Sequence, residues 1–210
     1  FGLRLTIFIT VPATVGLMIC ATPIFSLLFM GGEFDFAKAA KSADALFYYA
    51  LGLSLVALVR VLVPAFYALK DTKTPVITAF VAFLLNLCFS LMLMGPLLHA
   101  GLALASSLSA LCNMALLLYF LRKKIGPFDG RAIFSSGLKA VLASIPMAFL
   151  VAWSMRLADW TLAGHKVVKG LTLFGGIGAG AMAFMVVALL LRCEEAHEAV
   201  HLFRRKVLRK

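Results

Sequence analysis

Six long apolar segments leave this chain few ways to fold. They lie at about residues 5–30, 44–69, 75–97, 100–121, 133–156 and 167–191. Each is long enough to cross a ~30 Å hydrocarbon core as a helix, because ~20 residues at ~1.5 Å rise suffice. None of the segments alternates apolar and polar residues as a membrane β-strand does. The sequence therefore predicts an all-α integral membrane protein with six transmembrane helices joined by short connectors.

Composition and the sparse reactive residues argue against a soluble enzyme. Charged residues make up only 14% of the chain, whereas soluble domains have about 25%. The four cysteines form no CxxC pair, so we expect apolar core residues and neither disulfides nor metal ligands. His197 and His201 have i, i+4 metal spacing without an HExxH motif, which favours a solvated helix face. The chain begins with Phe1, and we expect it to be a piece of a longer protein.

Basic residues divide unevenly between alternate connectors, which predicts the topology. One set of connectors and the tail carry 13 of them: Arg4, Lys70, Lys73, Arg122, Lys123, Lys124, Arg131, Arg192, Arg204, Arg205, Lys206, Arg209 and Lys210. The other set carries only Lys38, Lys41, Lys166 and Lys169. The positive-inside rule places the richer set, and hence both ends of the chain, in the cytoplasm. The net charge of +11 then indicates contact with anionic membrane lipid, and no nucleic acid is expected as a partner.

Arg60 is the one cation deep inside an apolar segment. It precedes Lys70 by about ten residues, or ~15 Å of helix. An arginine near a helix centre costs ~2.5–3.5 kcal/mol on insertion scales, so something must compensate its charge. An anionic ligand or a water-filled cavity is one interpretation, and a buried structural ion pair is the other. Pro64, one turn later, is expected to bend the helix beside Arg60.

Several other features have simpler interpretations. Asp71 or Thr72 in DTKTP can cap the helix that follows, with Pro75 in its first turn. Gly176 and Gly180 have GxxxG spacing, which favours close helix packing over a nucleotide loop. The polar residues inside the third and fourth segments allow either Na⁺ coordination or hydrogen bonds between helices, and the candidates are Asn86, Ser90 and Ser106.

Three stretches resemble the MurJ (MviN) family of bacterial lipid II flippases, which belong to the MOP superfamily with the MATE exporters. They are VRVLVPAFYALKDTKTPV (59–76), LNLCFSLMLMGPLLHAGLALASSLSA (85–110) and GLRLTIFITVPATVGLMICATPIFSLLFMGGEFD (2–35). The resemblance implies helices nine to fourteen of a fourteen-helix, MATE-like protein. Residues 1–125 are then the last four helices of the second lobe, 126–192 two additional helices with a groove for a polyprenyl tail, and 193–210 a basic cytoplasmic amphipathic tail.

The resemblance also implies a function. The whole protein moves lipid II across the bacterial inner membrane by alternating access and is a transporter, not an enzyme. Its partners are then lipid II, membrane lipids and the N-terminal lobe of the same protein. The resemblance makes the Arg60 position typically basic, and we predict that Arg60 faces the cavity between the lobes with Pro64 bending its helix beside it. Some members hold Na⁺ where Asn86, Ser90 and Ser106 stand. In this chain Ser90 replaces an acid of that site, which weakens the case for Na⁺. Na⁺ and the membrane potential are therefore both candidate driving forces, and no cofactor is expected. A related MOP-superfamily exporter of another lipid-linked sugar or small molecule is the alternative.

Overall fold

A computed structural model describes residues 2–30, 35–126, 130–161 and 166–196. Within these residues the chain forms five α-helices and no strand: α1 (Gly2–Phe29), α2 (Phe36–Ala68), α3 (Lys73–Ile125), α4 (Gly130–Met155) and α5 (Lys166–Leu190). All five are long and apolar enough to cross a membrane. The all-helical prediction is confirmed. The bounds of the helices agree with the apolar segments to within a few residues, except that α2 begins earlier, at Phe36.

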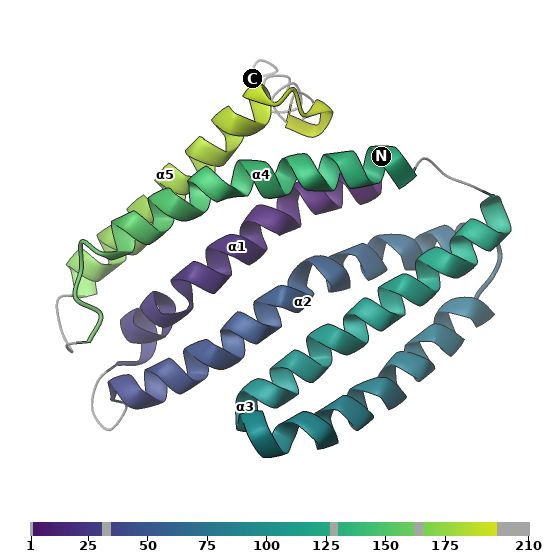
Figure 1. Cartoon of the computed structure of the whole chain (residues 1–210), viewed down its shortest axis with the longest axis horizontal. Helices are drawn as coiled ribbons and strands as arrows, with labels where there is room; N and C mark the ends of the chain where they lie inside the picture. The colour runs from purple at the N-terminus through teal and green to yellow at the C-terminus, as the bar shows by residue number, and fades with distance from the viewer. Residues whose placement is uncertain (1, 31–34, 127–129, 162–165, 197–210) are drawn as a thin grey trace, which may run out of the picture.

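The 53-residue helix α3 contains two of the six expected spans. Its backbone leaves the helical region at Leu98, where φ is 49° and ψ is −124°. Figure 1 shows α3 doubling back at this point, so that its two halves run side by side. Gly101, just after the turn, has no room for a side chain, because a Cβ there would lie 2.2 Å from the carbonyl oxygen of Leu93. The sequence MGPLLHAG thus makes a tight turn between two spans.

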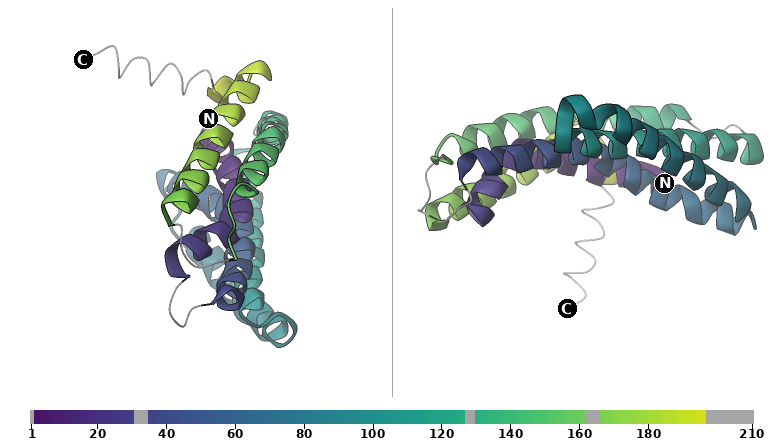
Figure 2. Two further views of the ribbon diagram at one scale, coloured as in Figure 1. Left: turned by 90° about the vertical axis from the view of Figure 1, so that its left-hand side faces the viewer. Right: turned by 90° about the horizontal axis from the view of Figure 1, so that it is seen from below.

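Helix α1 lies between two groups of helices (Figures 1 and 2). It packs against α2 on one side and against α4 and α5 on the other, and α2 packs against α3. Within the described elements, α4 and α5 touch the others through α1 alone. Any mechanical connection between the α4–α5 pair and α2–α3, in this part of the chain, therefore passes through α1.

Two separate apolar cores correspond to these two groups. Phe8 and Cys20 of α1 pack with residues of α4 and α5 such as Val151 and Phe184. The second core joins α2 to the second half of α3 through Leu62, Phe66, Leu117 and Leu121. Many large apolar side chains outside these cores are exposed, as expected for helices whose solvent is lipid.

The helices approach most closely at glycines. A Cβ at Gly176 would lie 2.1 Å from Ser154 Oγ, and one at Gly180 would lie 2.5 Å from Val151 Cγ2. These contacts confirm that GxxxG spacing in α5 serves packing, here against α4. Gly52 plays the same part in α2, where a Cβ would lie 2.7 Å from Ser107 Oγ.

One end of the bundle gathers the basic connectors, and we name it the basic end. The start of α1, the turn between α2 and α3, the end of α3, the start of α4 and the end of α5 all lie there (Figure 1). In that turn, Asp71 Oδ1 accepts hydrogen bonds from the backbone N–H groups of Lys73 (3.1 Å) and Thr74 (3.0 Å). Asp71 is therefore the cap, and Thr72 makes no side-chain cap bond.

The Asp71 carboxylate also pairs with Lys124 at the end of α3. Hydrogen bonds from Lys124 and Thr74 hold the pKa of Asp71 below its usual range. A carboxylate whose pKa is lower in the folded state than in the unfolded state stabilises the fold. This stabilisation is complete at pH values above the ordinary pKa of about 3.9, and it is lost as the pH falls below about 3.9 toward the pKa of the folded state.

We therefore expect Asp71→Asn to lower the thermal stability at pH 7, because the amide keeps the capping oxygen and loses the charge. The difference from the unmodified protein should shrink as the pH is lowered from about 7 to about 3. Thermal unfolding in detergent measures it, with Lys124→Gln expected to match Asp71→Asn and the neighbouring Lys123→Gln as the control. An equal loss of stability at both pH values contradicts the role of the charge.

Candidate functional site

An apolar groove with a volume of about 440 Å³ runs between α1, α4 and α5. Eight of its fourteen lining residues come from α1, including Phe8 and Gly16, and all fourteen are apolar or glycine. Met147 and Val151 of α4 and Phe184 of α5 complete the walls. Gly16 keeps the groove wide, since a Cβ there would lie 3.2 Å from the Met147 methyl group. The arrangement suits a long apolar chain and offers no polar anchor along its length.

A buried lysine lies at the end of the bundle opposite the basic end. Lys169, in the first turn of α5, is only 3% exposed. Its ammonium donates to Ser26 Oγ of α1 (3.2 Å) and lies 5.9 Å from the centre of the Trp160 ring. Ser26 in turn donates to the Trp160 carbonyl oxygen (2.7 Å). This cluster fixes the far ends of α1 and α5 to the connector between α4 and α5.

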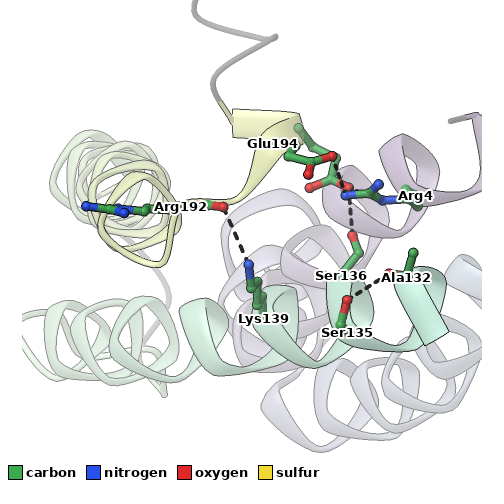
Figure 3. Close-up of polar contacts among 8 residues, drawn as sticks. Arg4, Ala132, Ser135, Ser136, Lys139, Arg192 and Glu194 are labelled. Atoms are coloured by element: carbon green, nitrogen blue, oxygen red, sulfur yellow. Dashed lines mark hydrogen bonds and ion pairs between the residues drawn. The ribbon is translucent and has the colours of Figure 1, made fainter.

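A carboxylate is buried at the basic end. Glu195 is 2% exposed, and its Oε1 accepts hydrogen bonds from Arg4 Nε (2.7 Å) and Ser136 Oγ (2.9 Å). Glu194 pairs with the same guanidinium at 3.0 Å but is largely exposed; Figure 3 shows it beside Arg4 and Ser136. Burial alone raises the pKa of Glu195, but hydrogen bonds from its own backbone and Ser136, together with Arg4, hold that pKa below its ordinary value.

Glu195 corrects one expectation from the sequence. We expected the charged residues of the tail to be exposed, yet Glu195 is buried together with Ala196, and Cys193 lies in the core as expected. The cause is Arg192, whose φ of 50° ends α5 and turns the chain back toward α1 and α4. The rest of the predicted amphipathic tail, residues 197–210, and the histidines expected on its solvated face lie outside the described residues.

Arg60 lies on an exposed face of α2. Within the described part of the chain, no acid lies within ion-pair distance of its guanidinium. Pro64 is exposed as well, and α2 continues through it to Ala68. Both residues therefore face away from the packed interior of these helices, and their assignment to a cavity stays a prediction.

Of the three residues considered for Na⁺, the structure brings two together, Asn86 and Ser106. Asn86 Nδ2 donates to Ser106 Oγ (3.4 Å) and Ser109 Oγ (3.1 Å), and so joins the two halves of α3. Among the described residues, the Ser90 hydroxyl bonds to neither of its two predicted companions. The assignment of these residues to a Na⁺ site stays a prediction, and the contacts that the structure shows are hydrogen bonds. They fit hydrogen bonding between helices, the second interpretation of the sequence.

Comparison with known proteins decides the family. The family described as "Lipid II flippase MurJ" matches residues 1–170, which is most of the chain. The chain belongs to the MurJ family. A probable lipid II flippase MurJ of Vibrio cholerae is 33% identical over 200 residues, which cover 91% of this chain and 36% of the relative. The lipid II flippase MurJ of Burkholderia cenocepacia is 34% identical over 163 residues, with 77% of this chain and 31% of the relative covered.

A solved structure gives the same result. A lipid II flippase MurJ in an inward closed conformation superimposes with a TM-score of 0.73 at 25% identity, over 90% of this chain and 38% of that one. The chain thus spans about a third of the length of the MurJ proteins that it matches. With its multi-pass helices, it is a protein of the bacterial inner membrane.

Two residues of the site, Lys169 and Glu195, were not predicted from the sequence. Lys169 was counted with the connector cations, because single-sequence hydropathy does not show that Ser26 and Trp160 cover it. Glu195 stood in a run of charges, EEAHE, that is typical of a solvated helix. The sequence carries no signal that distinguishes Glu195 from the acids beside it, since Arg4, near a helix end, can reach the membrane interface without an acid.

Proposed function

We propose that this chain is the C-terminal part of a flippase that moves lipid II from the inner to the outer leaflet by alternating access. Membership of the MurJ family carries the proposal, and the six spans agree with helices nine to fourteen of such a protein. The names of the matched relatives supply the substrate. In this proposal the N-terminal lobe and the first helices of the second lobe complete the transporter.

The groove between α1, α4 and α5 is the proposed site for the polyprenyl tail of lipid II. Its lining is apolar throughout, so an apolar chain can enter it from the bilayer without leaving a polar group unpaired, and van der Waals packing would hold the chain there. The α4–α5 pair alone was expected to form this groove, and α1 proves to supply more than half of its lining. A polyprenyl tail bound in the groove would therefore contact α1, a helix of the proposed second lobe, directly.

Arg60 is proposed to face the cavity between the lobes, where the pyrophosphate of lipid II requires cations. Its exposure on α2 and the lack of an acid beside it within the described residues support this placement. A guanidinium binds phosphate oxygens through paired hydrogen bonds. Pro64 is proposed to shape the helix next to it.

The proposed orientation puts the basic end in the cytoplasm. The connectors at that end carry most of the cations, which is the arrangement that the positive-inside rule describes. Both ends of the chain then lie on the cytoplasmic side and contact anionic lipid there. Asn86, Ser106 and Ser109 form hydrogen bonds between the two halves of α3, and Na⁺ and the membrane potential both stay candidate driving forces of the proposed transporter.

The test uses the full-length protein, meaning this chain together with the N-terminal part that the proposal assigns to it. Bacteria are depleted of their own flippase, and the lipid II accessible on the outer face is measured with and without the full-length protein. We expect accessibility to be restored, and repeating the measurement without a Na⁺ gradient and then without the membrane potential identifies the driving force. Normal insertion without restored accessibility indicates another lipid-linked sugar as substrate and overturns the proposal.

A further inference from the structure

The cluster around Glu195 joins three segments that are distant in sequence. Arg4 lies in the first turn of α1, Ser136 lies in the second turn of α4, and Glu195 follows the end of α5. A second contact runs from Lys139 Nζ of α4 to the carbonyl oxygen of Arg192 at 3.4 Å (Figure 3). The basic ends of all three groove helices are thus held together by polar contacts.

The cluster also lies at one mouth of the groove. Phe8, a lining residue, stands one helical turn after Arg4 on the same face of α1. Its ring lies 5.1 Å from the ring of Phe184 of α5, which also lines the groove. Cys193 and Ala196, from the segment that follows α5, are buried in the same core as these two rings.

We propose that Arg4, Ser136 and Glu195 form a clasp that closes the groove at the basic end and opens as a unit. Closed, it holds the ends of α4 and α5 against α1. Opened, it frees the segment after α5 and widens this mouth of the groove. Since α4 and α5 contact the other described helices through α1 alone, the clasp also fixes how they follow α1 when it moves. The clasp depends on contacts among these helices and closes the groove whatever the groove binds.

Physical reasons favour a clasp over ordinary surface pairing. An exposed ion pair contributes little, whereas a buried charge that loses its partner destabilises its surroundings strongly. Glu195 is 2% exposed and Arg4 is 24% exposed, so the pair is shielded from water on its carboxylate side. Glu194, 78% exposed, binds the same guanidinium from the water side and lacks this shielding. The two neighbouring acids should therefore differ sharply in effect.

Cys193 provides a native reporter of clasp opening. It is 1% exposed and sits two residues before Glu195, so a maleimide reaches it only when this segment opens. Cys20, also 1% exposed, lines the groove about three helical turns beyond Phe8, away from the basic end, and reports opening of the core there. Two versions of the full-length protein, each retaining one of these cysteines and no other, allow the two events to be measured separately.

We expect Glu195→Gln to speed the labelling of Cys193 on the order of tenfold, since the buried carboxylate loses its charge. Glu194→Gln, the matched control, should leave the rate near that of the unmodified protein. Labelling of Cys20 should remain slow in both variants, because the clasp opens without unfolding the core.

A second variant excludes a direct charge effect on the reporter. Burial raises the pKa of the Cys193 thiol, and the nearby Glu195 charge raises it further. Removing that charge therefore increases the reactive thiolate even without opening. Ser136→Ala changes no charge and removes one hydrogen bond to the carboxylate, and we expect it to raise the Cys193 rate a few-fold.

Three outcomes decide the proposal. Faster labelling of Cys193 alone in both Glu195→Gln and Ser136→Ala supports the clasp. Unchanged labelling in Ser136→Ala overturns it, because the effect of Glu195→Gln is then explained by the thiol pKa. Equal acceleration at Cys20 and Cys193 also overturns it, since Glu195 is then a general stabiliser of the core.

Discussion

Replacing Gly52 with leucine is expected to prevent α2 from packing against the second half of α3, with the largest loss of stability of any single change considered. A Cβ at Gly52 would lie 2.7 Å from Ser107 Oγ and 3.1 Å from Ser107 Cα. The second contact is with backbone, so no change of side-chain conformation can relieve it. Ser107 is also fixed by donating to the Tyr48 carbonyl oxygen at 2.6 Å.

The expected cost is roughly 3 kcal/mol or more, the upper part of the range for overpacking a tight contact. Thermal unfolding of the full-length protein in detergent, followed by size-exclusion chromatography, measures it. Gly178→Leu is the matched control, because Gly178 of α5 has open space where its side chain would stand. Similar unfolding temperatures for the two leucine variants contradict the close contact between α2 and α3.

A second pair of variants tests the contact itself. Gly52→Ala should destabilise the protein less than leucine does, since only the Cβ clash remains. Combining it with Ser107→Ala removes the nearest atom, Ser107 Oγ, and should restore part of the loss. An additive loss in the double variant, without recovery, shows that the two residues do not touch.

The spans could be predicted from the sequence because lipid imposes a length and a polarity on every helix. The turn in α3 was expected between 97 and 100 for the same reason, and it falls at Leu98. Gly176 and Gly180 were recognised because their spacing puts both on one face of a helix. Gly52 gives no such local signal, since its partner Ser107 belongs to another helix and only the folded chain brings them together.

The candidate site was harder to predict for a related reason. The family resemblance assigned a groove to 133–156 and 167–191, and hydropathy, which describes each helix separately, gave no sign that α1 lines the groove between them. Glu195 was missed because its burial depends on Arg192, where a positive φ turns the chain after α5. Arg60 was found by depth alone, and depth does not show which way a side chain points.

Arg60→Ala is expected to reduce lipid II transport by roughly 10- to 100-fold in the full-length protein. This is the effect of losing about 1.5–3 kcal/mol, the usual contribution of a hydrogen bond to a charged group. Folding should be nearly unaffected, because Arg60 is exposed on α2 and its guanidinium pairs with no acid among the described residues. The measurement is lipid II accessibility on the outer face of depleted bacteria, at equal amounts of protein in the membrane.

The charge and the shape of Arg60 can be separated with two further variants. Arg60→Lys keeps a cation but loses the planar pair of donors, so it should retain part of the activity. Arg60→Gln keeps a hydrogen-bond donor without charge and should resemble alanine if the pyrophosphate attracts the charge itself. Transport at the unmodified level in both alanine and glutamine variants removes Arg60 from the substrate path. If an acid of the proposed N-terminal part pairs with the guanidinium instead, the loss in Arg60→Ala should appear in thermal stability.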